Sequence, residues 1–180
     1  MRHLSIVSLV LFGTMIGHLH SVERAEAIPL LDFGPKIGYG SGVFTGDTIG
    51  EPSMSSLAFG VAASLDLVMV QLEADLLYLK NTTEVATGST DAEYVSVPII
   101  ARVDISPIPM VKFAVGGGFE RRMYLGDRKS PELNYVPISA RADLKVPMIG
   151  SAGVEGRFNY QMGDEDDKVH EFMLFLHVFL

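Results

Sequence analysis

Two segments of the chain have the residue types that could bind a phosphate or a metal ion. Gly38-Tyr39-Gly40-Ser41-Gly42 has the glycine content of a phosphate-binding loop, but it lacks the strand–loop–helix setting that such a loop needs. The acidic run Asp164-Glu165-Asp166-Asp167 could attract a divalent cation, yet no glycines are interleaved in it. We therefore interpret the first segment as a glycine-rich strand and the second as a solvated loop, and we expect no cofactor and no metal site.

A second kind of chemistry, ester hydrolysis, would need a serine, a histidine and an acid. His170 and Glu171 are adjacent in the sequence, and Ser130 and Ser139 are the candidate nucleophiles. The spacing of these residues does not bring them together in any defined geometry. We therefore predict no catalytic residues and no enzyme activity, and we interpret His177 as an interior side chain rather than a ligand.

The elements that would position these residues are strands with two different faces. The stretch from Tyr135 to Met148 is the clearest of them, because side chains on a strand point alternately to opposite sides. Its length is about that of a tilted strand that crosses a bilayer. One set of alternate residues is wholly apolar: Val136, Ile138, Ala140, Ala142, Leu144 and Val146. The other set is Tyr135, Pro137, Ser139, Arg141, Asp143 and Lys145.

Seven further stretches alternate in the same way, and their connections are long and short in turn. These stretches are 33–44, 57–67, 70–79, 95–105, 111–122, 152–160 and 171–180. Short turns are expected at 68–69, 106–109 and 147–150, and the longer loops include Asn81 to about Glu93. Closing eight such strands into a barrel removes the exposed sheet edges. We therefore predict an all-β fold, an eight-stranded antiparallel up-and-down transmembrane β-barrel.

Composition supports a secreted, membrane-associated chain. The 180 residues are 48% hydrophobic, and cysteine is absent, so disulfides and thiolate metal sites are excluded. A net charge of −8 argues against a nucleic-acid partner. Residues 1–27 have the basic start, the apolar run and the Ala25-Glu26-Ala27 spacing of a secretory signal peptide. We assign 1–27 to the signal and 28–180 to the outer-membrane β-barrel domain.

The charges indicate which face is inside. Seven basic and eight acidic residues lie on the polar face, and a narrow interior requires such balance because buried charges must be paired. Lysine or arginine facing lipid near the bilayer midplane would instead destabilise by roughly 2–4 kcal/mol each. We expect an interior salt-bridge network of Lys36, Asp66, Glu73, Asp75, Arg102, Asp104, Lys112, Glu120, Arg122, Arg141, Asp143, Lys145, Glu155, Arg157 and Glu171. Arg121 shares the phase of Phe119, so it should lie above the apolar band or mark a bulge.

Several segments resemble the porin-like family of small bacterial outer-membrane barrels, to which the outer-membrane protein A-like β-barrel domain belongs. Leu72 to Tyr78 resembles the third strand of that family, and 94–100 and 114–118 resemble the next two. The last strand, with Phe179, resembles the signal read by the outer-membrane assembly machinery, although the terminal residue is Leu180 rather than an aromatic. The resemblance implies an outer-membrane location, with membrane lipid and the assembly machinery as partners. It implies no catalytic residues.

The function expected from these observations is non-enzymatic. We predict a structural or surface-interaction protein with a closed, charged lumen and acidic extracellular loops, whose extracellular ligand is unknown. Two alternatives remain open: a narrow pore for water or small ions, and a lipid-modifying membrane hydrolase.

Overall fold

The computed structural model describes residues 30–45, 53–67, 70–85, 88–105, 110–126, 132–146, 150–163 and 168–180. The predicted signal peptide, the acidic run 164–167, Ser130 and the short turns at 68–69, 106–109 and 147–149 lie outside these residues. Every long regular element in the described part is a strand. None of the described residues forms a helix long and apolar enough to cross a membrane.

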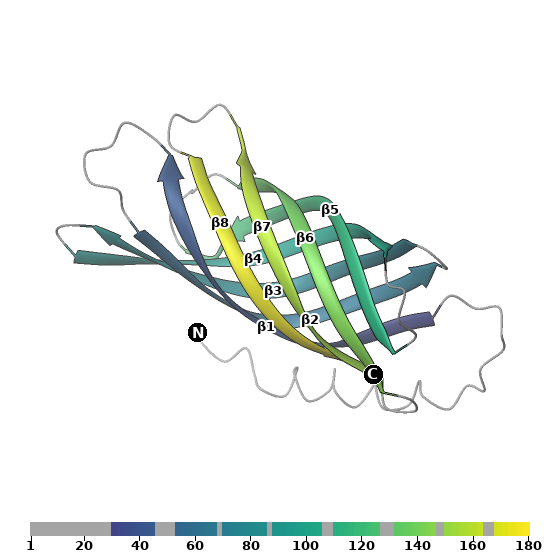
Figure 1. The fold of residues 1–180 in the computed structure, drawn as a ribbon. Helices are drawn as coiled ribbons and strands as arrows, with labels where there is room; N and C mark the ends of the chain where they lie inside the picture. Colours follow the sequence, from purple (N-terminus) through teal and green to yellow (C-terminus); the bar gives the residue numbers. More distant parts are fainter. Residues whose placement is uncertain are drawn as a thin grey trace.

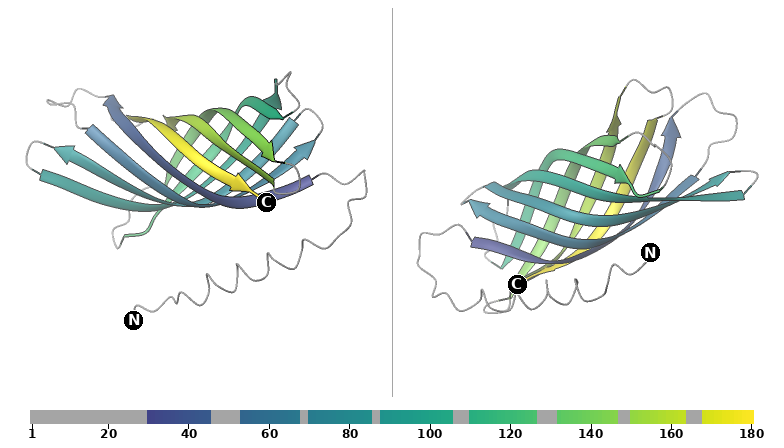
Figure 2. Two further views of the ribbon diagram at one scale, coloured as in Figure 1. Left: turned by 60° about the horizontal axis from the view of Figure 1, so that its bottom comes forward. Right: turned by 180° about the vertical axis from the view of Figure 1, so that it is seen from behind.

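Eight antiparallel strands close into one barrel, as the alternating pattern predicts (Figure 1). The strands are β1 (Leu30–Thr45), β2 (Ser53–Leu67), β3 (Val70–Val85), β4 (Gly88–Asp104), β5 (Val111–Tyr124), β6 (Leu133–Val146), β7 (Gly150–Met162) and β8 (Lys168–Phe179). Each strand pairs with its neighbours in sequence, and β1 pairs with β8 from Lys36↔His177 to Thr45↔Lys168. The two views of Figure 2 show the strongly tilted strands that such closure requires.

The expected long loop from Asn81 to about Glu93 is wrong. β3 continues to Val85 and β4 begins at Gly88, with the two strands paired without a break from Leu77↔Ser96 to Val85↔Gly88. The polar run escaped detection because both faces of this hairpin meet water, so the apolar contrast that marks a buried strand is absent. Gly88 begins β4 with φ of +145°, a backbone conformation that glycine adopts more readily than other residues.

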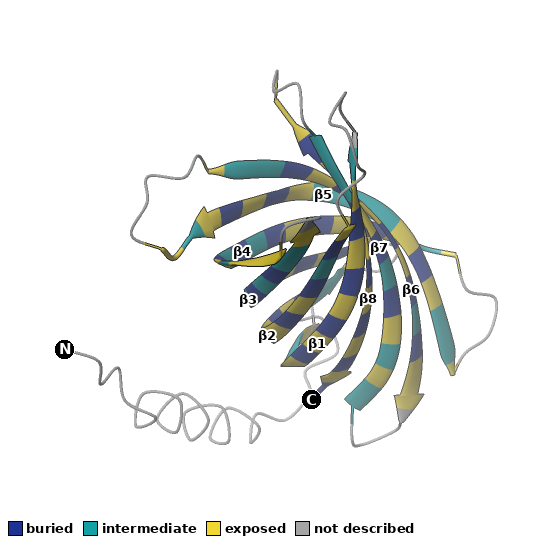
Figure 3. Cartoon of the chain, turned by 90° about the vertical axis from the view of Figure 1, so that its left-hand side faces the viewer, coloured by how far each residue is buried: buried dark blue, intermediate teal, exposed yellow. Residues whose placement is uncertain are grey.

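The two faces of the barrel wall differ sharply in chemistry. Buried and exposed residues alternate along each strand (Figure 3), and large apolar side chains project outward around the whole wall. Ile37, Leu76, Ile99, Ile138 and Leu174 are each more than half exposed. The inward face carries the buried charged and polar side chains, together with a smaller set of apolar ones. An apolar exterior around a charged interior is the arrangement of a barrel that spans the outer membrane.

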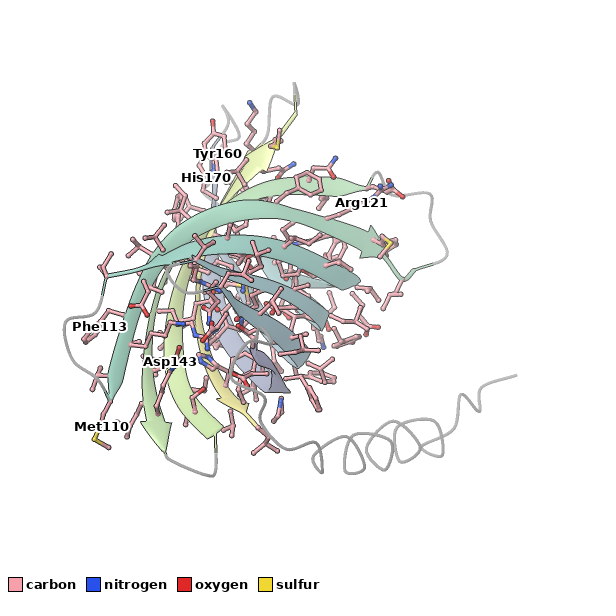
Figure 4. The ribbon with its side chains drawn as sticks, turned by 90° about the vertical axis from the view of Figure 1, so that its right-hand side faces the viewer. Met110, Phe113, Arg121, Asp143, Tyr160 and His170 are labelled. Atoms are coloured by element: carbon pink, nitrogen blue, oxygen red, sulfur yellow. The ribbon has the colours of Figure 1, made fainter. Side chains whose placement is uncertain are left out.

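Arg121 stays on the outward face without a bulge, because the β4–β5 register is continuous through Val97↔Arg121 and Pro98↔Glu120. Its guanidinium pairs with Glu132, the residue that precedes β6, and both side chains are about half exposed. Arg121 therefore lies at the rim with the long connections, well away from Asp143 in the interior (Figure 4). We call this end extracellular and the end with the short turns periplasmic, as in bacterial barrels of this kind.

Candidate functional site: the charged barrel interior

Lys36 is the centre of the largest ion-pair cluster inside the barrel. Its Nζ lies 2.7 Å from Glu73 Oε1, 2.9 Å from Asp75 Oδ2 and 2.6 Å from Glu155 Oε2. The lysine comes from β1 and its partners from β3 and β7, so these bonds cross the lumen. A lysine ammonium has three protons to donate, and here each can reach a different carboxylate. This single side chain therefore ties three strands together.

Three arginines surround the same carboxylates. Arg157 donates to Glu155 Oε1 at 2.9 Å and to Asp75 Oδ2 at 2.8 Å. Arg102 lies 2.7 Å from Glu155 Oε1, and its Nε donates to Ser139 Oγ at 2.8 Å.

Arg141 extends this cluster toward the periplasmic end. It lies 2.7 Å from Asp143 Oδ2 and also donates to Glu73. Asp143 in turn contacts His177 Nε2 at 2.6 Å. The central cluster thus pairs four basic side chains with four acidic ones, which is the balance that a buried set of charges needs. Its charged members are Lys36, Arg102, Arg141, Arg157, Glu73, Asp75, Asp143 and Glu155.

A smaller cluster lies closer to the extracellular end. Arg122 donates to Glu120 Oε1 and Glu171 Oε2, at 2.5 Å each. Ser96 Oγ donates to Glu120 at 2.8 Å, Asn159 Nδ2 donates to Glu171 at 3.2 Å, and Ser56 also donates to Glu171. These neutral donors help to satisfy the two carboxylates that share one arginine.

Aromatic rings inside the barrel pack against the cations. Phe175 is fully buried, with Lys36 Nζ 5.0 Å and Arg157 Cζ 4.6 Å from its ring centroid. Arg122 Cζ lies 4.1 Å from the Tyr135 ring, and Arg141 Cζ lies 4.6 Å from that of Phe179. Such contacts attract a cation to the ring face and fill space between the ion pairs.

An apolar layer completes the filling of the interior. Phe175 also belongs to a buried hydrophobic cluster, against which Tyr124 and Leu133 pack. The cluster consists of Ala58, Leu77, Leu79, Tyr94, Met173 and Phe175. The lumen therefore contains buried apolar side chains beside the ion pairs rather than a uniformly polar lining.

The structure places eleven of the fifteen predicted interior charges where they are at most 4% exposed. The other four lie at the periplasmic mouth. Lys112 Nζ is 2.9 Å from Asp66 Oδ2 and 3.8 Å from Asp104 Oδ2. The Lys145 side chain is 53% exposed and reaches Asp66 only at 3.9 Å. The eleven buried residues are Lys36, Glu73, Asp75, Arg102, Glu120, Arg122, Arg141, Asp143, Glu155, Arg157 and Glu171.

Sequence reasoning did not establish the partners of these charges, and it missed several members of the clusters. Arg102, for example, pairs with Glu73 and Glu155, which come from other strands. The additional members, including Ser56, Ser96 and Tyr135, share the inward phase of their strands. This alternation along the strand is the signal by which the sequence could have identified them as inward-facing. Contacts across the lumen leave no comparable pattern in the sequence.

The described residues of the Ser/His/acid set do not come together. Ser139 is buried in the lumen and accepts a hydrogen bond from Arg102. Glu171 is also inside, bound to Arg122. His170 is next in sequence and therefore faces the opposite side of the wall, where its ring stacks on Tyr160 at 4.5 Å (Figure 4). The barrel wall separates the imidazole from both, and Ser130 lies outside the described residues.

In the described part of the chain, no group of three or more histidine, aspartate and glutamate side chains is placed to hold a metal ion. The glycine-rich segment 38–42 lies within β1. It provides space for interior side chains, since a Cβ on Gly38 would lie 2.4 Å from the Phe175 ring.

One exposed ion pair lies outside the membrane-spanning part. Lys80 Nζ is 2.7 Å from Asp91 Oδ2, and Thr82 Oγ1 donates to Asp91 Oδ1 at 2.7 Å. The hydrogen bond from Lys80, followed by that from Thr82, lowers the pKa of Asp91 below its ordinary value. The same pairing raises the pKa of Lys80. Both side chains are well exposed, so the stabilisation from this pair is small and local to the β3–β4 hairpin.

Comparison with known proteins shows the fold. No protein-family model and no curated protein sequence matches the chain. Neisserial surface protein A is similar in structure, with a TM-score of 0.52 and 14% sequence identity over 81% of this chain and 96% of that one. Ail, the attachment invasion locus protein of Yersinia pestis, is similar with a TM-score of 0.46 and 16% sequence identity, over 83% of this chain and 98% of that one. The outer membrane enzyme PagL is similar with a TM-score of 0.45 and 12% sequence identity, over 79% of this chain and 98% of that one.

At these identities the likeness concerns the fold alone, and it rests on the first of the three structures. The chain therefore has the fold of the small eight-stranded outer-membrane β-barrels, as its sequence resemblance predicts.

Proposed function

We propose that this protein is a non-enzymatic outer-membrane barrel whose closed interior makes it a rigid support for segments presented at the cell surface. The observation that carries this proposal is the burial of the interior charges. Eleven charged side chains on seven strands are at most 4% exposed, so very little of their surface is open to solvent from either mouth. Eight strands leave room for little more than the side chains themselves.

Closure also follows from the way in which the interior is held. Glu73 and Glu155 are each contacted by cations from several strands. Breaking such a buried pair leaves a charge without a partner and destabilises the fold by about 3–5 kcal/mol. Opening a path would require several of these pairs to separate together. The interior therefore acts as a plug that stiffens the wall, and a stiff wall suits a scaffold for exposed loops.

The experiment is conductance of the purified, refolded protein in planar lipid bilayers, with an open porin as the positive control. We expect no steady single-channel steps from the wild-type chain. Stopped-flow light scattering of vesicles containing the protein should likewise show the water permeability of empty vesicles. Stable steps, or water flow above the empty-vesicle control, would contradict the closed lumen.

The second candidate is a narrow pore for water or small ions. One observation favours it: Asp75 Oδ1, Arg102 Nη1 and Glu120 Oε2 are buried polar atoms without a hydrogen-bond partner within the described structure. Such atoms along a lumen are the groups that a file of water molecules would contact. The same two measurements decide between the candidates, because the pore predicts the permeability that the closed barrel excludes.

Absence of catalysis is tested separately. The protein in outer-membrane lipid should release no fatty acid or headgroup when lipid products are measured by mass spectrometry. Release that is lost in both His170→Ala and Ser139→Ala would assign the hydrolase instead and would overturn the non-enzymatic part of the proposal.

A further inference from the structure

The outer ends of β3 and β4 extend beyond the strand next to them. The β3–β4 ladder continues to Val85↔Gly88, whereas the β4–β5 ladder ends at Tyr94↔Tyr124. One more bond follows, from Leu125 N to Glu93 O at 2.9 Å. Beyond it, no described strand pairs with Gly88–Ala92 on the side of β5. Figures 1 and 2 show this hairpin projecting past the neighbouring strand.

The opposite side of the same hairpin is covered. β2 pairs with β3 as far as Ser53↔Glu84, one residue from the end of β3. The projecting hairpin is therefore continuous with β2, which β1 in turn covers as far as Val43↔Ser53, and in the described part of the chain its open edge is on β4. Three paired strands hold their shape far better than an isolated hairpin does.

The direction of the open backbone groups follows from the ladder. In an antiparallel pair, consecutive residues direct their N–H and C=O groups to opposite sides. Glu93 O points toward β5, because it accepts the bond from Leu125. Asp91 and Ser89 share its phase, so their N–H and C=O groups point to the open side. The edge thus offers two donors and two acceptors in strand geometry, in a segment without proline or lysine.

The side chains around this edge are mainly acidic. Ser89, Asp91 and Glu93 alternate on one face of β4, and all three are exposed. Across the hairpin, Glu84 is exposed on β3, and Lys80 is already paired with Asp91. Three carboxylates against one ammonium leave this face with an excess of negative charge. A strand added here would be attracted if it carried basic side chains two residues apart, opposite Asp91 and Glu93.

We propose that the open edge of β4, Gly88–Ala92, binds an extended basic segment of another protein by adding it to the sheet as a further strand. Backbone hydrogen bonds to Ser89 and Asp91 supply the affinity, and the acidic face selects the charge of the partner. This inference rests on the surface role proposed above but not on the closed lumen, so conductance experiments and the binding experiment below fail independently.

The test uses the full barrel in lipid nanodiscs and a fluorescent eight-residue peptide of alternating lysine and threonine. Binding is followed by fluorescence anisotropy. Ser89→Pro removes an open-edge donor without removing a β3–β4 ladder bond, and Ser89→Ala keeps the donor as its matched control. We expect Ser89→Pro to weaken binding about tenfold or more and Ser89→Ala to leave it unchanged. Unchanged heat-modifiable gel mobility shows that both variants are folded.

Two comparisons separate strand addition from simple charge attraction. The same peptide with alternate backbone nitrogens methylated keeps its charge but cannot pair, so it should bind at least about tenfold more weakly. Asp91→Asn at the edge should weaken binding more than Glu84→Gln on the covered strand. Equal binding of the methylated peptide, or of Ser89→Pro, would overturn the proposal. A wild-type dimer that Ser89→Pro dissociates in sedimentation would also overturn it, by making a second copy the occupant.

Discussion

Gly38 and Phe175 are directly opposite each other in the β1–β8 ladder, and the phenyl ring occupies the space that a side chain at Gly38 would need. A Cβ on Gly38 would lie 2.4 Å from Phe175 Cδ1. Phe175 is fully buried and takes part both in the apolar cluster and in the contacts with Lys36 and Arg157. The glycine therefore sets the position of the ring that joins the charged and apolar layers of the interior.

Gly38→Ala should destabilise the barrel by about 1–3 kcal/mol, because the added methyl group overpacks a filled interior. Gly156→Ala is the matched control, since a Cβ there would lie 3.6 Å from the Phe172 ring, an ordinary contact. Urea unfolding in phospholipid vesicles measures both. Equal stability of the two variants would show that the ring can move aside.

Arg141→Ala should destabilise by about 3–5 kcal/mol, because it leaves Glu73 and Asp143 buried with one cation fewer. Lys145→Ala, on the same strand and the same face, should change stability by less than about 1 kcal/mol, since its side chain is 53% exposed. The same unfolding assay compares them. A similar loss in both variants would mean that interior ion pairs do not hold the barrel together.

Ala140→Arg should destabilise by about 2–4 kcal/mol in bilayers, because this outward residue lies near the middle of β6. Ala152→Arg introduces the same change near the periplasmic end of β7 and should have an effect of only about 0–1 kcal/mol. This depth dependence should disappear in short-chain detergent micelles. If both arginines were tolerated in bilayers, the outward face would not contact lipid.

The carboxyl group of Asp91 should titrate below the ordinary range of aspartate, and Lys80→Gln should raise its pKa, because the hydrogen bond from Lys80 is the main cause of the shift. A folded-state pKa below the unfolded value means that the pairing stabilises the hairpin above the unfolded pKa. That stabilisation is lost as the pH falls through the folded pKa. NMR titration of the labelled carboxyl carbon measures both variants. An unshifted wild-type value would show that the pair does not form in solution.

The number of strands, their order and the side of each strand that points inward could be predicted, because each depends on the local alternation of polar and apolar residues. In β6, Arg141 and Asp143 alternate with Ala140 and Ala142, and only one of the two faces tolerates lipid. The hydrophobic period marks every strand whose outward face is in the membrane. It disappears in the outer half of the β3–β4 hairpin, where water contacts both sides, and for this reason the pattern predicts a loop from Asn81 to about Glu93 instead of a hairpin.

The partners inside the lumen were decided by tertiary structure alone. Lys36 meets Glu73 and Glu155, which are 37 and 119 positions away, and Arg102 pairs with the same two residues from other strands. Alternation shows that these side chains point inward. The height of each side chain along the barrel axis, however, depends on the tilt and stagger of all eight strands after closure. The sequence alone thus determined which charged side chains face inward, and the geometry of the closed barrel decided which of them are deeply buried and which of them pair.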